Sequence, residues 1–323
     1  MTRTSRWLLA GMGASGVFAV LLAHAFPGKT APSSAEAASA PSKSVAGATT
    51  EEQFQSPEEI AKTFRAELER LAERKGLVSP MELVRQAEAQ KTTTLETLPD
   101  PGQKLAPEAI YAKTRPGVVI IGGITKGKKR RDGQLLFGTG FVIRKDGMIV
   151  TNCHVVIGFQ DMKTVGVMTD DGRMFPITAV LAADSRNDVA ILKVEADNLT
   201  PLPVAASAPV GARIYCISHP ALNTPETETG FYTFTEGVVS AKFRLRLHGY
   251  PALNVLTITA DYAKGSSGAP ILNEHGAVVG IVCETLPLYG DAQEQDVQMV
   301  WKFSRPSSSI LALLREKPPA PKP

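Results

Sequence analysis

The feature that most constrains the fold of this chain is a series of short apolar runs separated by turns that contain glycine. The runs typical of β-strands span residues 118–121, 140–143, 148–150, 165–168, 189–194, 213–217, 237–241, 255–259 and 277–283. Asp146-Gly147 and His275-Gly276 are turn sequences between such runs. Many strands with few helices predict a mostly β fold, an antiparallel barrel or a sandwich. Short helices are expected near residues 107–113 and 307–315.

The first 25 residues have the pattern of an export signal. Arg3 and Arg6 precede an uncharged apolar run over residues 7–23, and Ala23-His24-Ala25 offers the small residues that signal peptidase reads. The alternative is an uncleaved membrane anchor, a tether within residues 7–26, because the run is long enough to span a bilayer. Both interpretations place the rest of the chain outside the cytoplasm, in the periplasm or secreted.

Two further segments precede the β-rich part. Residues 26–56 consist mostly of Ala, Ser and Pro, which predicts a linker without a packed core. Residues 57–104 form a helical extension, since Ser56-Pro57 and Ser79-Pro80 are both helix-start signals. One face of the first helix carries Ile60, Phe64, Leu68 and Leu71. We favour an amphipathic spacer lying on the following domain, and a coiled or oligomerising element remains the alternative.

Three separate stretches carry residues that can act together in nucleophilic catalysis. Ser267 lies in Gly265-Ser266-Ser267-Gly268, His154 follows directly on a strand, and Asp188 stands at the entrance of the strand at 189–194. Each has an ordinary structural explanation when taken alone: a flexible turn, a structural histidine and a carboxylate facing water. A serine, a base and an orienting acid are together the set that activates a hydroxyl nucleophile. Asp184 is the alternative acid.

The order His154, Asp188, Ser267 is that of the trypsin-like serine proteases, and the surrounding segments resemble the HtrA/Deg branch of that family. The matching segments are 137–143, 151–156, 187–192, 237–241 and 265–271, within a region of about residues 105–315. The resemblance implies a trypsin-like protease domain over residues 105–323 that consists of two six-stranded antiparallel barrels. Barrel 1, about 113–203, would carry His154 and Asp188, and barrel 2, about 207–304, would carry Ser267.

The resemblance also implies the chemistry. Ser267 would attack a peptide carbonyl, His154 would transfer the proton, and Asp188 would orient the imidazole. The amides of Gly265 and Ser267 would form the oxyanion hole. We therefore expect an exported serine endopeptidase for protein or peptide substrates, with a role in protein quality control or processing. No cofactor or metal is required, and a homo-oligomer is left open. The alternative is a catalytically silent protease fold that binds peptides or acts as a scaffold.

The chain departs from the family pattern at several positions. No room remains after residue 315 for a PDZ domain, so we expect that module to be absent. Cys153 and Cys283 stand where relatives usually have no cysteine, and Cys283 follows a segment that in relatives pairs with the substrate backbone. The chain has three cysteines, and we favour no disulfide. Asp261 lies six residues before Ser267, where trypsin holds the acid that selects Lys or Arg. Relatives with other preferences carry aspartate there too, so a basic preference is not favoured.

Charge gives little information on partners. The formal net charge is +3, and no nucleic-acid partner is expected. Two basic clusters stand out, one over residues 126–131 and one formed by Lys242, Arg244, Arg246 and His248 on one strand face. A solvated surface is the favoured interpretation of both, and an acidic surface, an anionic lipid head group or a self-cleavage site is the alternative.

Overall fold

The computed structural model describes residues 56–89, 91–126, 133–221, 230–245, 252–291 and 293–315. The expected export signal lies outside these ranges, as do all but the last residue of the expected linker and parts of both basic clusters. Within the described ranges, no helix is long and apolar enough to cross a membrane.

The first β-sheet has seven antiparallel strands in the order β6-β5-β2-β3-β4-β8-β7. Their bounds are β2 Val118–Thr125, β3 Leu135–Arg144, β4 Met148–Thr151, β5 Met162–Met168, β6 Met174–Phe175, β7 Ile177–Asp184 and β8 Val189–Val194. Successive side chains of a strand point to opposite faces, and β2 follows this rule. Val118 and Ile120 belong to one apolar cluster, and Val119 and Ile121 belong to another. The sheet is thus packed on both faces.

The second sheet is a closed barrel with the strand order β10-β11-β14-β13-β12-β9. Its strands are β9 Arg213–Ser218, β10 Thr233–Leu245, β11 Leu253–Ile258, β12 Pro270–Leu272, β13 Val278–Tyr289 and β14 Val297–Pro306. The expectation of a mostly β fold with two barrel-like halves is confirmed. The first half has seven strands instead of the expected six, because the two-residue strand β6 adds a short hairpin to β5.

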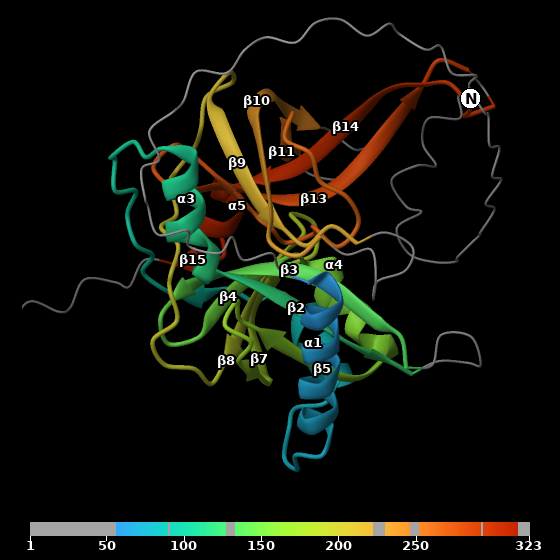
Figure 1. The fold of residues 1–323 in the computed structure, drawn as a ribbon. Coiled ribbons are helices and arrows are strands. Elements are labelled where there is room, and N and C mark those ends of the chain that lie inside the picture. Colours follow the sequence, from blue (N-terminus) through green and yellow to red (C-terminus); the bar gives the residue numbers. More distant parts are fainter. Residues whose placement is uncertain are drawn as a thin grey trace, which may run out of the picture. The chain divides into compact units, whose positions relative to one another are not determined.

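Helices α1 (Pro57–Ala72) and α2 (Pro80–Glu88) begin where the start signals predict, and Ser56 Oγ accepts the Glu59 amide at 3.2 Å. Phe64 and Leu68 of α1 are fully buried in the same cluster as Val118 and Ile120. Figure 1 shows α1 in blue beside β2 and β5. The extension therefore packs on the first sheet through its apolar face.

The remaining elements are short. They are α3 Pro107–Thr114, α4 Cys153–Ile157, α5 Ser307–Leu311, the 3₁₀ turns Arg115–Gly117 and Gly158–Asp161, and a parallel pair of β1 Thr93–Thr94 with β15 Leu314–Arg315. The position of α4 matters most for function, because it follows β4 directly and carries His154.

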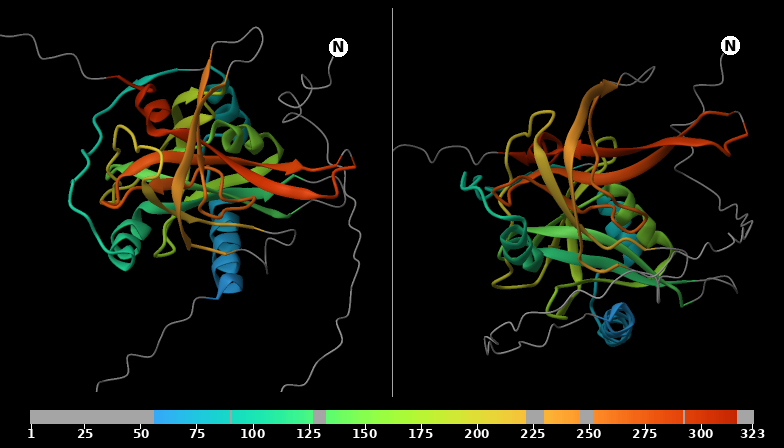
Figure 2. Two further views of the ribbon diagram at one scale, coloured as in Figure 1. Left: turned by 90° about the horizontal axis from the view of Figure 1, so that it is seen from above. Right: turned by 45° about the horizontal axis from the view of Figure 1, so that its top comes forward.

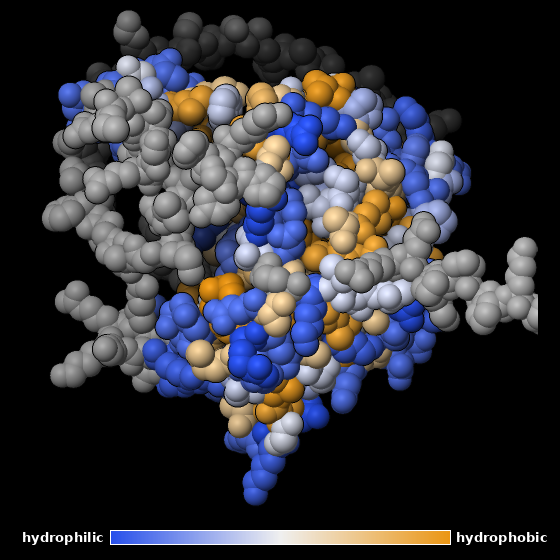
Figure 3. Space-filling model, turned by 180° about the vertical axis from the view of Figure 1, so that it is seen from behind, coloured by the Kyte–Doolittle hydropathy of each residue, from blue (hydrophilic) through white to orange (hydrophobic). Residues whose placement is uncertain are grey.

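Strands β13 and β14 extend beyond the other strands of the barrel (Figures 1 and 2). Leu286, Val297, Met299 and Val300 on this extension are exposed. On the face drawn in Figure 3, apolar patches lie among polar and charged side chains.

Candidate active site

The loop that carries Ser267 has a backbone that only glycine tolerates at two positions. Gly265 and Gly268 have φ of +91° and +90°, a region that L side chains rarely adopt. A Cβ on Gly268 would lie 2.0 Å from the Thr139 carbonyl oxygen, and one on Gly265 would lie 2.4 Å from the His219 carbonyl oxygen. The two glycines therefore let the loop make a tight bend directly against neighbouring backbone.

This loop belongs to the second barrel but is held by the first. The Thr139 amide of β3 donates to the Ser267 carbonyl at 2.8 Å, and Thr139 Oγ1 donates to the Gly265 carbonyl at 2.9 Å. Thr151 Oγ1 in turn donates to the Thr139 carbonyl at 2.8 Å. Since Thr151 ends β4 just before α4, these bonds tie the serine loop to the strand end that precedes His154.

His154 and Asp188 come together because their strands pair. Strand β4 is antiparallel to β8, with Thr151 opposite Ala190, so the segment that follows β4 lies beside the residue that precedes β8. His154 Nδ1 is 2.7 Å from Asp188 Oδ2, and the His154 amide donates to Asp188 Oδ1 at 2.9 Å. Asp188 has φ of +53°, an uncommon backbone for a residue with a side chain. Two contacts thus hold the carboxylate on one side of the ring.

The electrostatics of the histidine follow from this pairing. Burial lowers the pKa of the His154 imidazole, but the hydrogen bond to Asp188 and the negative charges of Asp188 and Glu284 outweigh it and raise the pKa above its usual value. The side chain is still 51% exposed, so the ring remains accessible to a substrate. The alternative acid Asp184 instead accepts the amides of Arg186 and Asn187 at 2.9 Å and organises their turn.

The implied triad requires a hydrogen bond between Ser267 Oγ and His154 Nε2, and the structure shows a different partner for the serine. Its Oγ donates to the Cys283 carbonyl at 3.2 Å, and among the described residues no hydrogen bond joins it to His154. Asn152 connects the two sides: its Nδ2 donates to the Asp188 carbonyl at 2.8 Å and to Cys283 Sγ at 3.3 Å. Ser267 and Asn152 therefore both form hydrogen bonds with Cys283 of β13, and the Ser267 hydroxyl is turned toward that strand.

Asn152 was not predicted from the sequence. Its position two residues before His154 and directly after a strand was the available signal, but the contacts that define its role come from distant segments. The side chain is fully buried, and among the described residues its Oδ1 has no hydrogen-bond partner.

Two backbone amides in the serine loop are free to bind an anion. In the part of the chain that the structure describes, the Ser266 amide donates to Ala263 and the Gly268 amide donates to Val282, whereas those of Gly265 and Ser267 donate to no group. Unpaired amides beside a nucleophile are the donors that an oxyanion needs.

Asp261, the candidate substrate-binding residue, lies at the surface. Its side chain is 86% exposed and forms an ion pair with Lys302. An acid that selects a basic side chain must sit at the base of a buried pocket to discriminate, and this carboxylate does not.

The three cysteines are buried, and each is a free thiol. Burial raises the pKa of Cys153 and of Cys216 to about 12 and also raises the pKa of Cys283. Cys283 thus lies in the site as a neutral thiol. In the described ranges, no group of three His, Cys, Asp or Glu residues could hold a metal ion.

Comparison with known proteins adds the family context. Residues 138–281 match the family described as trypsin-like peptidase domain. A probable periplasmic serine endoprotease DegP-like of Chlamydia pneumoniae is 34% identical over 48% of this chain and 30% of its own length. A protein of the same description from Hahella chejuensis is 40% identical over 45% of this chain and 29% of its own.

The chain therefore spans about three tenths of the length of these curated relatives. Protease Do-like 1, chloroplastic, of Arabidopsis thaliana is 32% identical over 55% of this chain and 41% of its own. Among solved structures, the HtrA-type protease AlgW with tripeptide has the same fold, with a TM-score of 0.50, 20% identity and coverage of 64% of this chain and 62% of that one. Residues 138–281 therefore match a trypsin-like peptidase domain, and this part of the chain is similar to DegP-like and Do-like proteases.

Proposed function

We propose that this protein is a serine endopeptidase that hydrolyses peptide bonds of proteins through an acyl-enzyme at Ser267. The observation that carries the proposal is the His154–Asp188 pair, which is joined by two hydrogen bonds. Hydrogen bonds through Asn152 and Cys283 connect this pair to Ser267, which lies beside two free amides. The trypsin-like peptidase domain over residues 138–281 supports the same reaction class.

In the proposed reaction, Ser267 Oγ attacks the peptide carbonyl while His154 Nε2 takes its proton. Asp188 keeps Nδ1 protonated and stabilises the imidazolium that forms. The free amides of Gly265 and Ser267 bind the oxyanion of the tetrahedral intermediate. His154 then gives the proton to the leaving amine, and water hydrolyses the acyl-enzyme by the same steps.

The reaction requires Ser267 to change its hydrogen bond. Its Oγ must leave the Cys283 carbonyl and turn to His154 Nε2 when substrate binds. Side-chain rotation of this kind is fast, and catalytic hydrogen bonds of free enzymes often form only in the complex. One weak neutral bond opposes the change, at a net cost of about 1 kcal/mol.

The cellular setting is part of the proposal. The basic and apolar start of the chain and the two relatives described as periplasmic support export to the periplasm, with a membrane tether through residues 7–26 as the alternative. There the enzyme would act in protein quality control or processing, alone or as a homo-oligomer.

A second function, that of a silent peptide-binding fold, is favoured by one observation: Ser267 donates to Cys283 and not to His154. Hydrolysis of casein, followed by mass spectrometry of the fragments, separates the two. The wild type should cleave, and Ser267→Ala should lose activity by a factor on the order of 10⁶ while it keeps its fold. An intact casein band with folded wild type would support the silent alternative, and cleavage by Ser267→Ala at the wild-type rate would show that the nucleophile is another group.

A further inference from the structure

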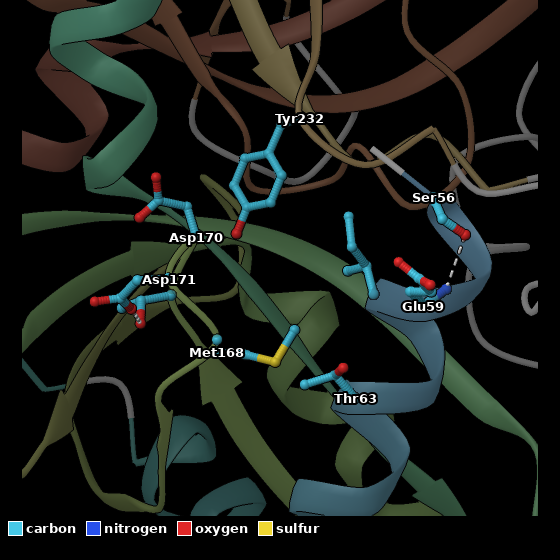
Figure 4. A pocket seen from close by; sticks show the side chains of 10 residues that line it. Ser56, Glu59, Thr63, Met168, Asp170, Asp171 and Tyr232 are labelled. Carbon is cyan, nitrogen blue, oxygen red and sulfur yellow. Dashed lines mark hydrogen bonds between the residues drawn. The ribbon is translucent and has the colours of Figure 1, made fainter. Parts of the chain in front are cut away.

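The pocket drawn in Figure 4, of about 350 Å³, lies between α1 and the turn that joins β5 to β6, and its lining shares no residue with the candidate active site. Asp170 in this lining already pairs with Arg115 at 3.7 Å. Asp171 pairs with Arg173 at 2.7 Å, and the Tyr232 hydroxyl is fully enclosed. Among its described residues, the pocket therefore has no group that selects a ligand.

Asn152, in contrast, is a polar side chain that is buried among the candidate catalytic residues. It follows Thr151 at the end of β4, directly precedes α4, and is fully buried. An amide nitrogen has two hydrogens to donate, and Asn152 Nδ2 has two acceptors: the Asp188 carbonyl at 2.8 Å and Cys283 Sγ at 3.3 Å. The first acceptor precedes β8 of the first sheet and the second lies on β13 of the barrel, so Asn152 joins the two halves of the fold beside the catalytic pair.

The oxygen of the same amide shows that stability alone does not explain this side chain. Asn152 Oδ1 is enclosed and accepts no hydrogen bond from any described residue. A buried acceptor without a partner costs free energy, and a catalytic role is one of the reasons for which native proteins retain such a group. Since Nδ2 is the part of the amide that has partners, the role of Asn152 lies in what this donor holds.

The group that Asn152 Nδ2 holds is a strained piece of backbone. Asp188 has φ of +53°, a conformation that is unfavourable for a residue with a Cβ and persists only where its surroundings fix it. Three groups of residues 152–154 meet Asp188. Asn152 Nδ2 binds its carbonyl, the His154 amide binds Oδ1 at 2.9 Å, and His154 Nδ1 lies 2.7 Å from Oδ2. One short segment thus holds both the main chain and the carboxylate of Asp188.

We propose that Asn152 is a positioning residue of the peptidase, whose side-chain amide fixes the Asp188 backbone so that the carboxylate meets His154 Nδ1. The inference rests on the proposed function, in which Asp188 orients the imidazole and stabilises its charged form. Asn152 acts through Asp188 and takes no part in the proton transfer.

Two variants of the full chain remove the donor without adding a charge, Asn152→Ala and Asn152→Val, and valine suits the extended backbone at this position (φ −78°, ψ 148°). With a fluorogenic peptide, kcat should fall about 10²-fold, the loss that misplacement of a catalytic group by 1 Å can cause, while KM stays within about threefold. In the Asp188→Asn background, the same substitutions should change kcat by less than about twofold, because the carboxylate through which Asn152 acts is gone. An equal 10²-fold loss in that background, or loss of the fold in both variants, would overturn the proposal.

A titration of His154 tests the same point without catalysis. NMR of the full chain carrying Ser267→Ala, with labelled histidine and the signal assigned by a His154→Gln variant, gives the pKa of the imidazole. Burial lowers this pKa, the hydrogen bond to Asp188 and the charges of Asp188 and Glu284 raise it, and Arg305 lowers it. Since the two variants loosen only the contact with Asp188, the midpoint should move to lower pH. An unchanged midpoint in both variants would overturn the proposal.

Asn273→Ala is the matched control, because this amide holds a turn far from the catalytic pair. Asn273 Nδ2 donates to Asp100 Oδ2 at 2.7 Å, and its Oδ1 accepts the amides of His275 and Ala277 at 2.9 Å. Its loss should lower the Tm but leave kcat within about twofold and the imidazole midpoint unchanged; an equal shift of the midpoint would overturn the proposal. Absence of cleavage by the wild type would refute the proposed function, whereas the NMR midpoint would still decide the positioning role.

Discussion

Replacing Gly268 with alanine should damage both stability and catalysis, because Gly268 is the point where the serine loop touches the first sheet. The new Cβ would lie 2.0 Å from the Thr139 carbonyl oxygen and 2.5 Å from Thr151 Oγ1. Relief requires a displacement of about 1.4 Å, the difference between the 2.0 Å approach and an ordinary 3.4 Å contact. That movement must break or stretch the bonds of Thr139 to Ser267 and Gly265.

The expected loss of stability is the sum of the conformational cost and the cost of the weakened hydrogen bonds. A positive φ costs alanine about 1–2 kcal/mol, and the two weakened hydrogen bonds cost about 0.5–1.5 kcal/mol each. The free energy of unfolding should therefore fall by about 2–5 kcal/mol. Misplacement of a catalytic group by 1 Å can cost about 10²-fold in rate, so kcat/KM should fall at least that much in molecules that remain folded.

Gly211 provides the matched control. It has φ of +85°, but a Cβ there would meet no atom within 4 Å, so Gly211→Ala bears only the conformational cost of about 1–2 kcal/mol and should keep wild-type turnover. Urea unfolding gives the stability difference, and peptide hydrolysis normalised to folded protein gives the rate. If Gly268→Ala matched Gly211→Ala in both measurements, the anchoring of the serine loop on Thr139 would be wrong.

Four further predictions concern charged groups. Asp188→Asn should lower kcat about 10⁴-fold with little change in fold, because the imidazole loses the acceptor that sets its tautomer; steady-state kinetics beside circular dichroism checks this. Since only the neutral imidazole of His154 acts as a base and its pKa is raised above 6.5, kcat/KM should rise with pH to a plateau with a midpoint above that value. Glu284→Gln, which removes one of the charges that raise this pKa, should move the midpoint to lower pH, and an unchanged or higher midpoint would contradict the assigned electrostatics. Asp261→Asn should leave the ratio of kcat/KM for peptides with Lys and Leu before the scissile bond within about twofold, because the carboxylate is exposed and paired with Lys302; a larger drop would place it in the specificity pocket.

Helices and strands could be predicted from the sequence where the pattern that specifies them lies within one segment. Ser56 and Ser79 mark the starts of α1 and α2, and the apolar runs recur inside the observed strands. Strands β7, β12 and β14 and the two-residue strands β1, β6 and β15 were not predicted. β7 carries alanines that are neutral toward strand formation, and the first four residues of β14 are all exposed, so their burial does not alternate as in a half-buried strand.

Features that depend on distant segments were not accessible from the sequence. The bond from Ser267 to Cys283 and the bridging position of Asn152 arise when β13 and β4 meet, which no local spacing encodes. Asp261 shows the same limit: its offset from Ser267 matches that in trypsin, but the pairing with Lys302 of β14 holds it at the surface.

Labelling with a fluorophosphonate probe tests the central claim most directly, because the probe reacts only with a serine that is activated by its base and faces an oxyanion hole. Mass spectrometry of the digested adduct assigns the labelled residue. We expect one adduct per chain on Ser267 in the wild type and in Ser266→Ala, whose side chain is buried against Ser218, and none in Ser267→Ala. Folded wild-type protein that stays unlabelled, or an adduct that persists in Ser267→Ala, would contradict the assignment of this site as the active centre of a serine peptidase.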